Sequence, residues 1–113
     1  MTISNSIIRI VDDEAVVRKA LKFLLESEGW TVEAYEKGSE FLVEDRPSLI
    51  GCLILDVAMP EMNGLELYQR LRERKYAVPV IFLTGHGDVD MAVQAMKDGA
   101  IDFIQKPINE ERL

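Results

Sequence analysis

Residues 51–64 decide the fold class, and their sequence is Gly51-Cys52-Leu53-Ile54-Leu55-Asp56-Val57-Ala58-Met59-Pro60-Glu61-Met62-Asn63-Gly64. The run before Asp56 is apolar at consecutive positions, which is typical of a strand covered on both faces of a sheet. Pro60 and the Asn63-Gly64 pair indicate a loop, and a helix is expected from about Leu65 to Arg74. A buried strand, a loop and a helix in this order form the repeating unit of a parallel α/β sheet.

The same unit occurs twice before this stretch. A β-branched run over 7–11 predicts a strand, and the apolar spacing after it predicts an amphipathic helix that ends at Gly29. A second strand is expected over Thr31–Tyr35, followed by a short helix over Ser39–Val43. The expected buried stripe of the first helix is Val17, Ala20, Leu21, Leu24 and Leu25.

The unit also occurs after residues 51–64. A fourth strand is expected over Pro79–Leu83 and a fifth over Asp102–Gln105. The helix between them is expected to begin at Asp88 as its N-cap and to end at Gly99. Five strands separated by helices predict an α/β fold with a doubly wound parallel sheet and right-handed crossovers. The expected buried stripe of the helix after Asp88 is Val89, Ala92, Val93 and Met96.

The end of the sequence is short for this fold. After Pro107 only Ile108–Leu113 remain, enough to begin a fifth helix but not to complete it. Without that helix, a five-stranded sheet would expose part of one face. We therefore expect residues 1–113 to be one domain with an absent or truncated fifth helix, cut from a longer protein or lacking its tail.

Composition excludes several classes of function. The formal net charge of −7 argues against direct contact with nucleic acid, which needs clustered Lys and Arg. One cysteine, Cys52, excludes an internal disulfide framework and a Cys-based zinc site. No apolar run approaches the length of a membrane span. A cytoplasmic domain without membrane contact is expected.

Polar residues follow the ends of four predicted strands, where open α/β sheets bind their ligands. Each has an ordinary structural explanation when taken alone; Asp13, for example, could simply cap a helix. Together, three carboxylates within a few ångström repel one another, so cations are expected among them. One ammonium group and a hard divalent ion such as Mg²⁺ fit that role. These residues are Asp12, Asp13, Asp56, Thr84 and Lys106.

The motifs Asp12-Asp13, residues 53–64, Thr84-Gly85 and Lys106-Pro107 together resemble the receiver domain of bacterial two-component response regulators. The resemblance covers essentially the whole chain, and each motif follows the expected strand. It implies the strand order 2-1-3-4-5. The segments Thr84–Asp88 and Asp102–Pro107 look like the subgroup that controls transcription, which implies a C-terminal DNA-binding or ATPase output domain.

The resemblance also implies a role for each residue at the site. Asp56 would take a phosphoryl group from a sensor histidine kinase, and Lys106 and Thr84 would contact the phosphoryl oxygens. Thr84 and Phe103 would form the conformational switch, and the Lys106-Pro107 bond would be cis. The implied Mg²⁺ ligands are Asp12, Asp13 and Asp56 with the Ala58 carbonyl. Such a domain is no enzyme, because it phosphorylates and dephosphorylates only itself.

One departure from the family pattern and two candidate contact surfaces add three expectations. Ala58 is smaller than the residue that many family members carry there, so water should reach the acyl phosphate and its lifetime should be short to moderate. The apolar pair Val16 and Phe23, beside Lys19, is a candidate kinase-docking surface. Met91 and Ala95 are expected to face away from the buried stripe, as a surface for a phosphorylation-dependent homodimer.

Two other functions use similar features. A Mg²⁺ phosphatase with an Asp nucleophile would need that nucleophile after the first strand and a covering cap domain. This sequence has neither an Asp-x-Asp pair at that position nor room for the cap. A flavodoxin-like carrier would need a first loop rich in Gly, Ser and Thr, whereas Asp12-Asp13-Glu14 would repel a phosphate.

Overall fold

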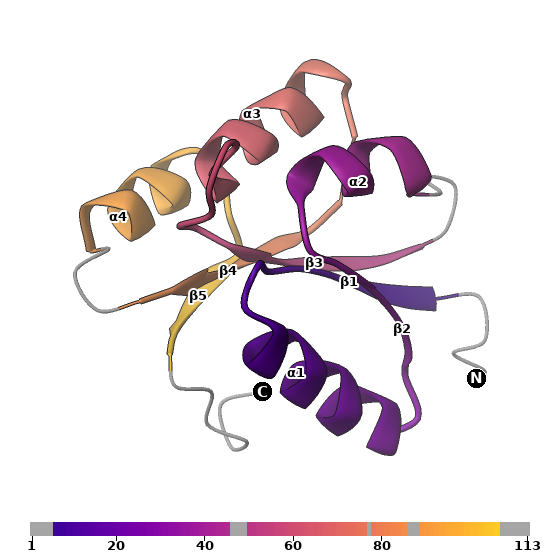
Figure 1. The fold of residues 1–113 in the computed structure, drawn as a ribbon. Helices are drawn as coiled ribbons and strands as arrows, with labels where there is room; N and C mark the ends of the chain where they lie inside the picture. Colours follow the sequence, from indigo (N-terminus) through magenta and orange to yellow (C-terminus); the bar gives the residue numbers. More distant parts are fainter. Residues whose placement is uncertain (1–5, 46–49, 77, 86–88, 107–113) are drawn as a thin grey trace.

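The computed structural model describes residues 6–45, 50–76, 78–85 and 89–106. Its five strands form one parallel sheet in the order β2-β1-β3-β4-β5 (Figure 1). This order and the α/β class confirm the predicted fold. The strands are β1 (Ser6–Val11), β2 (Thr31–Tyr35), β3 (Ile50–Asp56), β4 (Val80–Thr84) and β5 (Asp102–Gln105).

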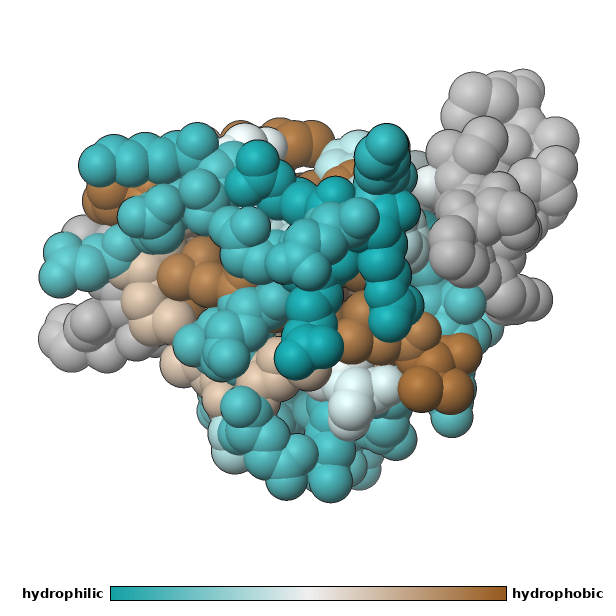
Figure 2. All heavy atoms as spheres, turned by 90° about the horizontal axis from the view of Figure 1, so that it is seen from above, coloured by the Kyte–Doolittle hydropathy of each residue, from teal (hydrophilic) through white to brown (hydrophobic). Residues whose placement is uncertain are grey.

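Helices cover both faces of the sheet. One face carries α1 (Ala15–Ser27), whereas α2 (Gly38–Glu44), α3 (Gly64–Glu73) and α4 (Val89–Lys97) lie on the other (Figure 1). The outer surface over these three helices is largely hydrophilic (Figure 2). Residues 107–113, where the sequence predicts the start of a fifth helix, lie outside the described residues. No helix in the described ranges is long and apolar enough to cross a membrane.

Each sheet face has its own hydrophobic core. Alternate β1 residues point to opposite faces, so Ile8 and Ile10 pack with α1 while Val11 packs with α2 and α3. The predicted stripe of α1 is correct at its centre, because Leu21 and Leu25 are buried. Ala20 is exposed, which corrects the prediction for that position. Gly29 follows α1 with a φ of 95°, as a helix-ending glycine should.

The buried face of α4 differs from the predicted stripe. Ala92 and Ala95 are buried, and Met91 packs against the core, whereas Val93 is 48% exposed and Met96 39% exposed. The prediction was therefore wrong for both exposed residues and for the outward direction of Met91 and Ala95. The exposed polar residues Asp90, Gln94 and Lys97 follow a helical spacing along one side of α4, and the buried alanines lie opposite them. The prediction selected the larger apolar residues instead, whereas α4 packs through its small alanines. Asp88, the predicted N-cap, lies outside the described residues.

A buried ion pair joins β1 to the end of α2. The Arg9 side chain is fully buried, and its Nε lies 2.7 Å from Oδ1 of Asp45, which directly follows α2. The Tyr76 hydroxyl donates a hydrogen bond to the same carboxylate. Burial and this bond raise the pKa of Tyr76. The ion pair links two residues that are 36 apart in the sequence and joins β1 to the end of α2.

Candidate functional site

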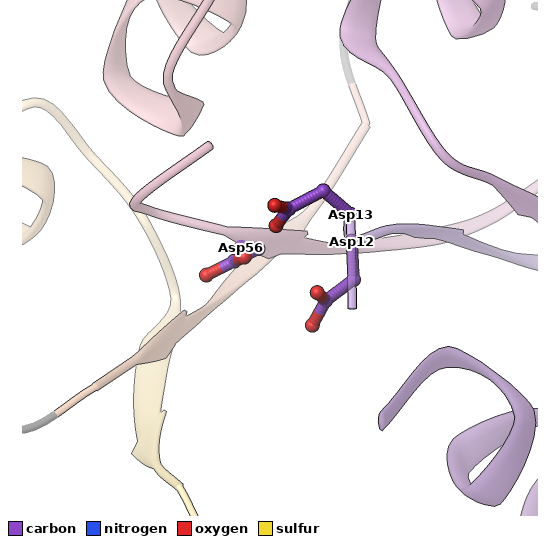
Figure 3. Close-up of side chains that lie close together, drawn as sticks. All are labelled: Asp12, Asp13 and Asp56. Carbon is purple, nitrogen blue, oxygen red and sulfur yellow. The ribbon is translucent and has the colours of Figure 1, made fainter. Parts of the chain in front are cut away.

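Three carboxylates meet at the carboxyl end of the sheet. Asp12 directly follows β1, Asp13 comes next, and Asp56 is the last residue of β3. One carboxylate oxygen from each residue lies within 4.8 Å of the others (Figure 3). Asp12 and Asp56 are buried, and Asp13 is half-buried. The predicted convergence of these residues is therefore observed.

The β1–α1 loop holds Asp12 through its backbone and its side chain. The Asp12 N–H donates to the Tyr35 carbonyl at 3.1 Å, and the Glu14 N–H donates to Asp12 Oδ1 at 2.8 Å. Arg18 donates to the Asp12 carbonyl at 2.8 Å. Glu14, rather than Asp13, occupies the N-cap position of α1. The capping explanation of Asp13 is therefore wrong, and its carboxylate points toward Asp56 (Figure 3).

The β3–α3 loop folds tightly behind Asp56. The Gly64 N–H donates to the Val57 carbonyl at 2.8 Å, and a Cβ atom on Gly64 would lie 2.3 Å from the Asp56 carbonyl oxygen. Only glycine fits there. The Ala58 N–H donates to Asp56 Oδ1 at 3.4 Å, and the Ala58 side chain is exposed. Glu61 adopts a φ of 67°, a left-handed conformation that is unfavourable for a side-chain-bearing residue.

Lys106 brings a cation to the carboxylates from the end of β5. Its Nζ lies 2.5 Å from Glu14 Oε1, 3.3 Å from Asp12 Oδ2 and 3.4 Å from Asp56 Oδ1. Burial alone would lower the pKa of Lys106, but the bond to Glu14 and the carboxylates of Asp12 and Asp56 outweigh it and raise the pKa. The ammonium is therefore charged at neutral pH.

Ionisation of Asp56 is unfavourable at this site. Burial is the largest cause, followed by the neighbouring Asp12 carboxylate, and together they raise the pKa of Asp56 from 3.8 to about 8 despite the opposing effect of Lys106. A carboxylate in such surroundings is stabilised by any cation that reaches it. The site is thus an anionic pocket with one lysine at its edge.

The donor set fits a hard divalent cation. All candidate ligands are oxygens, and the buried Asp12 Oδ2 accepts no hydrogen bond within the described part of the chain, although Lys106 lies 3.3 Å away. Few carboxylates with room for water at a half-exposed edge suit Mg²⁺ better than an all-protein calcium cage. Asp12, Asp13 and Asp56 could hold such an ion.

The remaining predicted residues lie around this cluster. Thr84 is buried at the end of β4, and its carbonyl accepts the Lys106 N–H at 2.8 Å. Phe103 on β5 is 38% exposed. On α1, Val16 is 83% exposed and Phe23 72% exposed, so this apolar pair is open to a partner. Pro107 lies outside the described residues.

Sequence reasoning missed two residues of the site. Glu14 was not among the predicted site residues, yet it makes the shortest ion-pair contact of Lys106. The Asp12-Asp13-Glu14 run was the available signal, but sequence distance could not show which acid reaches Lys106. Gly64 was assigned to a turn, and its close approach to Asp56 appears only in three dimensions.

Comparisons with known proteins agree with this geometry. The family model of the response regulator receiver domain matches residues 8–113. The response regulator protein TodT of Pseudomonas putida strain F1 is 49% identical over 96% of this chain and 48% of its own length. The transcriptional regulatory protein FixJ of Bradyrhizobium diazoefficiens is 43% identical over 94% of this chain and 52% of its own.

A solved structure gives the same result. The response regulator StyR matches with a TM-score of 0.88 and 44% identity, over 95% of this chain and 54% of StyR. The chain thus spans about half the length of each of these relatives.

Proposed function

The chain belongs to the family of response regulator receiver domains, and from that premise we propose that Asp56 accepts a phosphoryl group from a sensor histidine kinase. The observation that carries the proposal is the cluster of Asp12, Asp13 and Asp56 with Lys106 at the carboxyl end of the sheet. Family membership sets aside the phosphatase and flavin-carrier alternatives. The domain modifies only itself and turns over no separate substrate.

The chemical step is a phosphoryl transfer between side chains. An oxygen of the Asp56 carboxylate attacks phosphorus, an acyl phosphate bond forms, and the P–N bond to the kinase histidine breaks with its electron pair returning to the imidazole. Lys106, 3.4 Å from Asp56, neutralises charge on the incoming oxygens. Mg²⁺, held by Asp12, Asp13, Asp56 and the Ala58 carbonyl, would supply further charge neutralisation.

A switch follows from the same site. Thr84 is buried beside Lys106, and its hydroxyl would bond a phosphoryl oxygen, drawing the β4 end toward Asp56. Phe103, whose ring is 38% exposed, would then turn inward. Substituting Thr84→Ala should leave labelling of Asp56 intact while abolishing the change in Phe103 exposure, measured by amide and ring NMR signals.

The output of this switch lies outside residues 1–113. The relatives are about twice as long, and FixJ is a transcriptional regulatory protein. We therefore assign this chain to the N-terminal part of a longer cytoplasmic transcription regulator. The net charge of −7 favours a C-terminal output domain, rather than this one, as the part that contacts DNA. A homodimer through Met91 and Ala95 is not proposed, because Ala95 is buried.

Kinase docking is assigned to Val16, Lys19 and Phe23 on α1. The apolar pair is more than two-thirds exposed, beside the loop that carries Asp12 and Asp13. Phe23→Glu should slow phosphotransfer from the kinase at least about tenfold, or ~1.4 kcal/mol, without changing labelling by acetyl phosphate. Equal slowing with both donors would contradict a docking role.

The decisive experiment is intact mass after incubation with acetyl phosphate and Mg²⁺. One added phosphoryl group is expected in the wild type, none after chelation of divalent ions, and none in Asp56→Asn. A folded protein that gains no mass would refute the proposed function.

The exposed Ala58 side chain leaves the acyl phosphate open to water, which predicts a short to moderate lifetime. Ala58→Met should slow hydrolysis, and a change of less than about twofold, or ~0.4 kcal/mol, would remove this explanation.

A further inference from the structure

The ammonium of Lys106 donates a hydrogen bond to Glu14 and lies at ion-pair distance from two further carboxylates. A lysine ammonium carries three N–H donors and no acceptor. In the structure, Nζ faces three carboxylates, those of Glu14 at 2.5 Å, Asp12 at 3.3 Å and Asp56 at 3.4 Å. An oxygen of an incoming phosphoryl group would be a further acceptor at the same ammonium. It would compete with the carboxylates already there, above all for the N–H group that is donated to Glu14.

Exposure identifies the contact that is given up. The Glu14 side chain is 58% exposed, whereas those of Asp12 and Asp56 are 0% and 3% exposed. Water can solvate the released Glu14 carboxylate immediately, but it cannot reach the two buried carboxylates at similar cost. Glu14 also makes the shortest contact, so it has the largest influence on where the ammonium lies before the exchange.

Resting on the proposed phosphorylation of Asp56, we propose that Glu14 is a positioning residue that holds Lys106 in the unphosphorylated state and is exchanged for a phosphoryl oxygen. Glu14 touches neither the reacting carboxylate nor phosphorus and acts only through Lys106. Its carboxylate therefore competes with the phosphoryl group. This competition weakens the affinity of the site for tetrahedral phosphoryl-like anions and speeds the return of Lys106 after dephosphorylation.

The test measures anion affinity without covalent chemistry. Beryllium trifluoride, a phosphoryl analogue, is titrated into this chain with Mg²⁺, and the bound anion is detected by ¹⁹F NMR. Glu14→Gln should bind it about two- to fivefold more tightly than the wild type, the factor for loss of a partly exposed ion pair of ~0.4–1 kcal/mol. Glu14→Asp, which keeps the charge on a shorter side chain, should lie between the two.

A matched control separates competition from net charge. Glu61 lines a cavity of about 60 Å³ together with Asp13, so Glu61→Gln removes one negative charge close to the site. The recorded ion pairs of Lys106 in the described ranges do not involve Glu61. Glu61→Gln should therefore tighten binding less than half as much as Glu14→Gln. Both side chains are exposed, so both variants should fold.

Each outcome decides between the two proposals. Equal tightening in Glu14→Gln and Glu61→Gln, or weaker binding in Glu14→Gln, would overturn the role of Glu14 and leave phosphorylation of Asp56 standing. A wild type that is folded and binds no beryllium trifluoride would overturn the phosphoryl site itself, and the role of Glu14 with it. A merely structural Glu14 could not tighten binding, because its removal would only loosen the loop that carries Asp12.

Discussion

Replacing Asp56 by Asn should make the protein more stable in buffer free of divalent ions. Most substitutions of a buried residue destabilise a protein. Here burial, first, and the Asp12 carboxylate, second, raise the pKa of Asp56 to about 8. Folding of the wild type therefore keeps neutral a side chain that is ionised in the unfolded chain, and this lowers the free energy of unfolding. Asparagine matches the shape of the neutral carboxyl and can donate its N–H to neighbouring carboxylates.

The size of the effect follows from the two pKa values. The unfolded Asp56 ionises near 3.8, and the folded one near 8. At pH 7, about three pH units above 3.8, Asp56 is ionised in the unfolded chain and mostly neutral in the folded one. Each of these pH units stabilises the unfolded chain by ~1.4 kcal/mol. The upper limit is therefore about 4 kcal/mol. Small movements of the half-buried Asp13 and of Lys106 can ease the ionisation of Asp56 and so reduce this limit. We expect Asp56→Asn to raise the free energy of unfolding by about 2–4 kcal/mol at pH 7.

The pH dependence has a definite sign. Because the pKa of Asp56 is higher in the folded state, the wild type loses stability as pH rises between about 4 and about 8. The variant lacks this component, so the difference between the two proteins should grow across the same interval. Urea unfolding followed by circular dichroism, at about pH 5, 6 and 7 with EDTA present, measures this difference.

Divalent ions supply the second half of the test. Mg²⁺ should stabilise the wild type, because it binds the folded carboxylates and not the unfolded chain, and should stabilise Asp56→Asn much less. A variant that is equally stable or less stable at pH 7 would refute the electrostatic reasoning. So would a stability difference that does not change with pH.

Three further substitutions test the surroundings of the site. Gly64→Ala should lower the free energy of unfolding by about 2 kcal/mol or more and impair labelling by acetyl phosphate, because its Cβ would lie 2.3 Å from the Asp56 carbonyl oxygen; normal labelling would contradict this. Asp45→Asn should destabilise by ~3 kcal/mol or more in urea unfolding, because it removes a buried carboxylate from buried Arg9. Glu61→Gly should raise the melting temperature by removing about 1 kcal/mol of left-handed strain at a φ of 67°; a lower value would argue against strain.

The fold was predictable because local signals agreed with one another. Apolar runs without alternation indicated strands buried on both faces, and Gly29 and Gly99, with φ of 95° and 105°, ended helices as predicted. The face of α4 was mispredicted because the larger apolar residues were taken as its buried stripe. The exposed polar residues Asp90, Gln94 and Lys97 lie opposite the buried Ala92 and Ala95, so the polar spacing was the better guide to the rotation of this helix.

The site was predictable to the extent that strand ends determine position. Asp12, Asp56 and Lys106 follow strands that the sheet order brings together, so their convergence needed no side-chain detail. The Glu14–Lys106 contact joins residues 92 apart, and no local pattern distinguishes Glu14 from other exposed acids. The Arg9–Asp45 pair could not be predicted for the same reason, because a charged residue in a strand gives no sequence signal of the residue that it pairs with.

The anchored loops explain why the repulsion among the carboxylates is not relieved by movement. Bonds from Tyr35, Glu14 and Arg18 hold Asp12, and the approach of Gly64 holds the backbone of Asp56. Ionisation of Asp56 therefore stays unfavourable at the site until a cation or a change of Lys106 contacts offsets it. Because the Lys106 N–H is bonded to the Thr84 carbonyl, a new partner for the Lys106 ammonium acts on the end of β4 as well. On this view the exchange at Glu14 and the switch at Thr84 are two consequences of one lysine changing its acceptors.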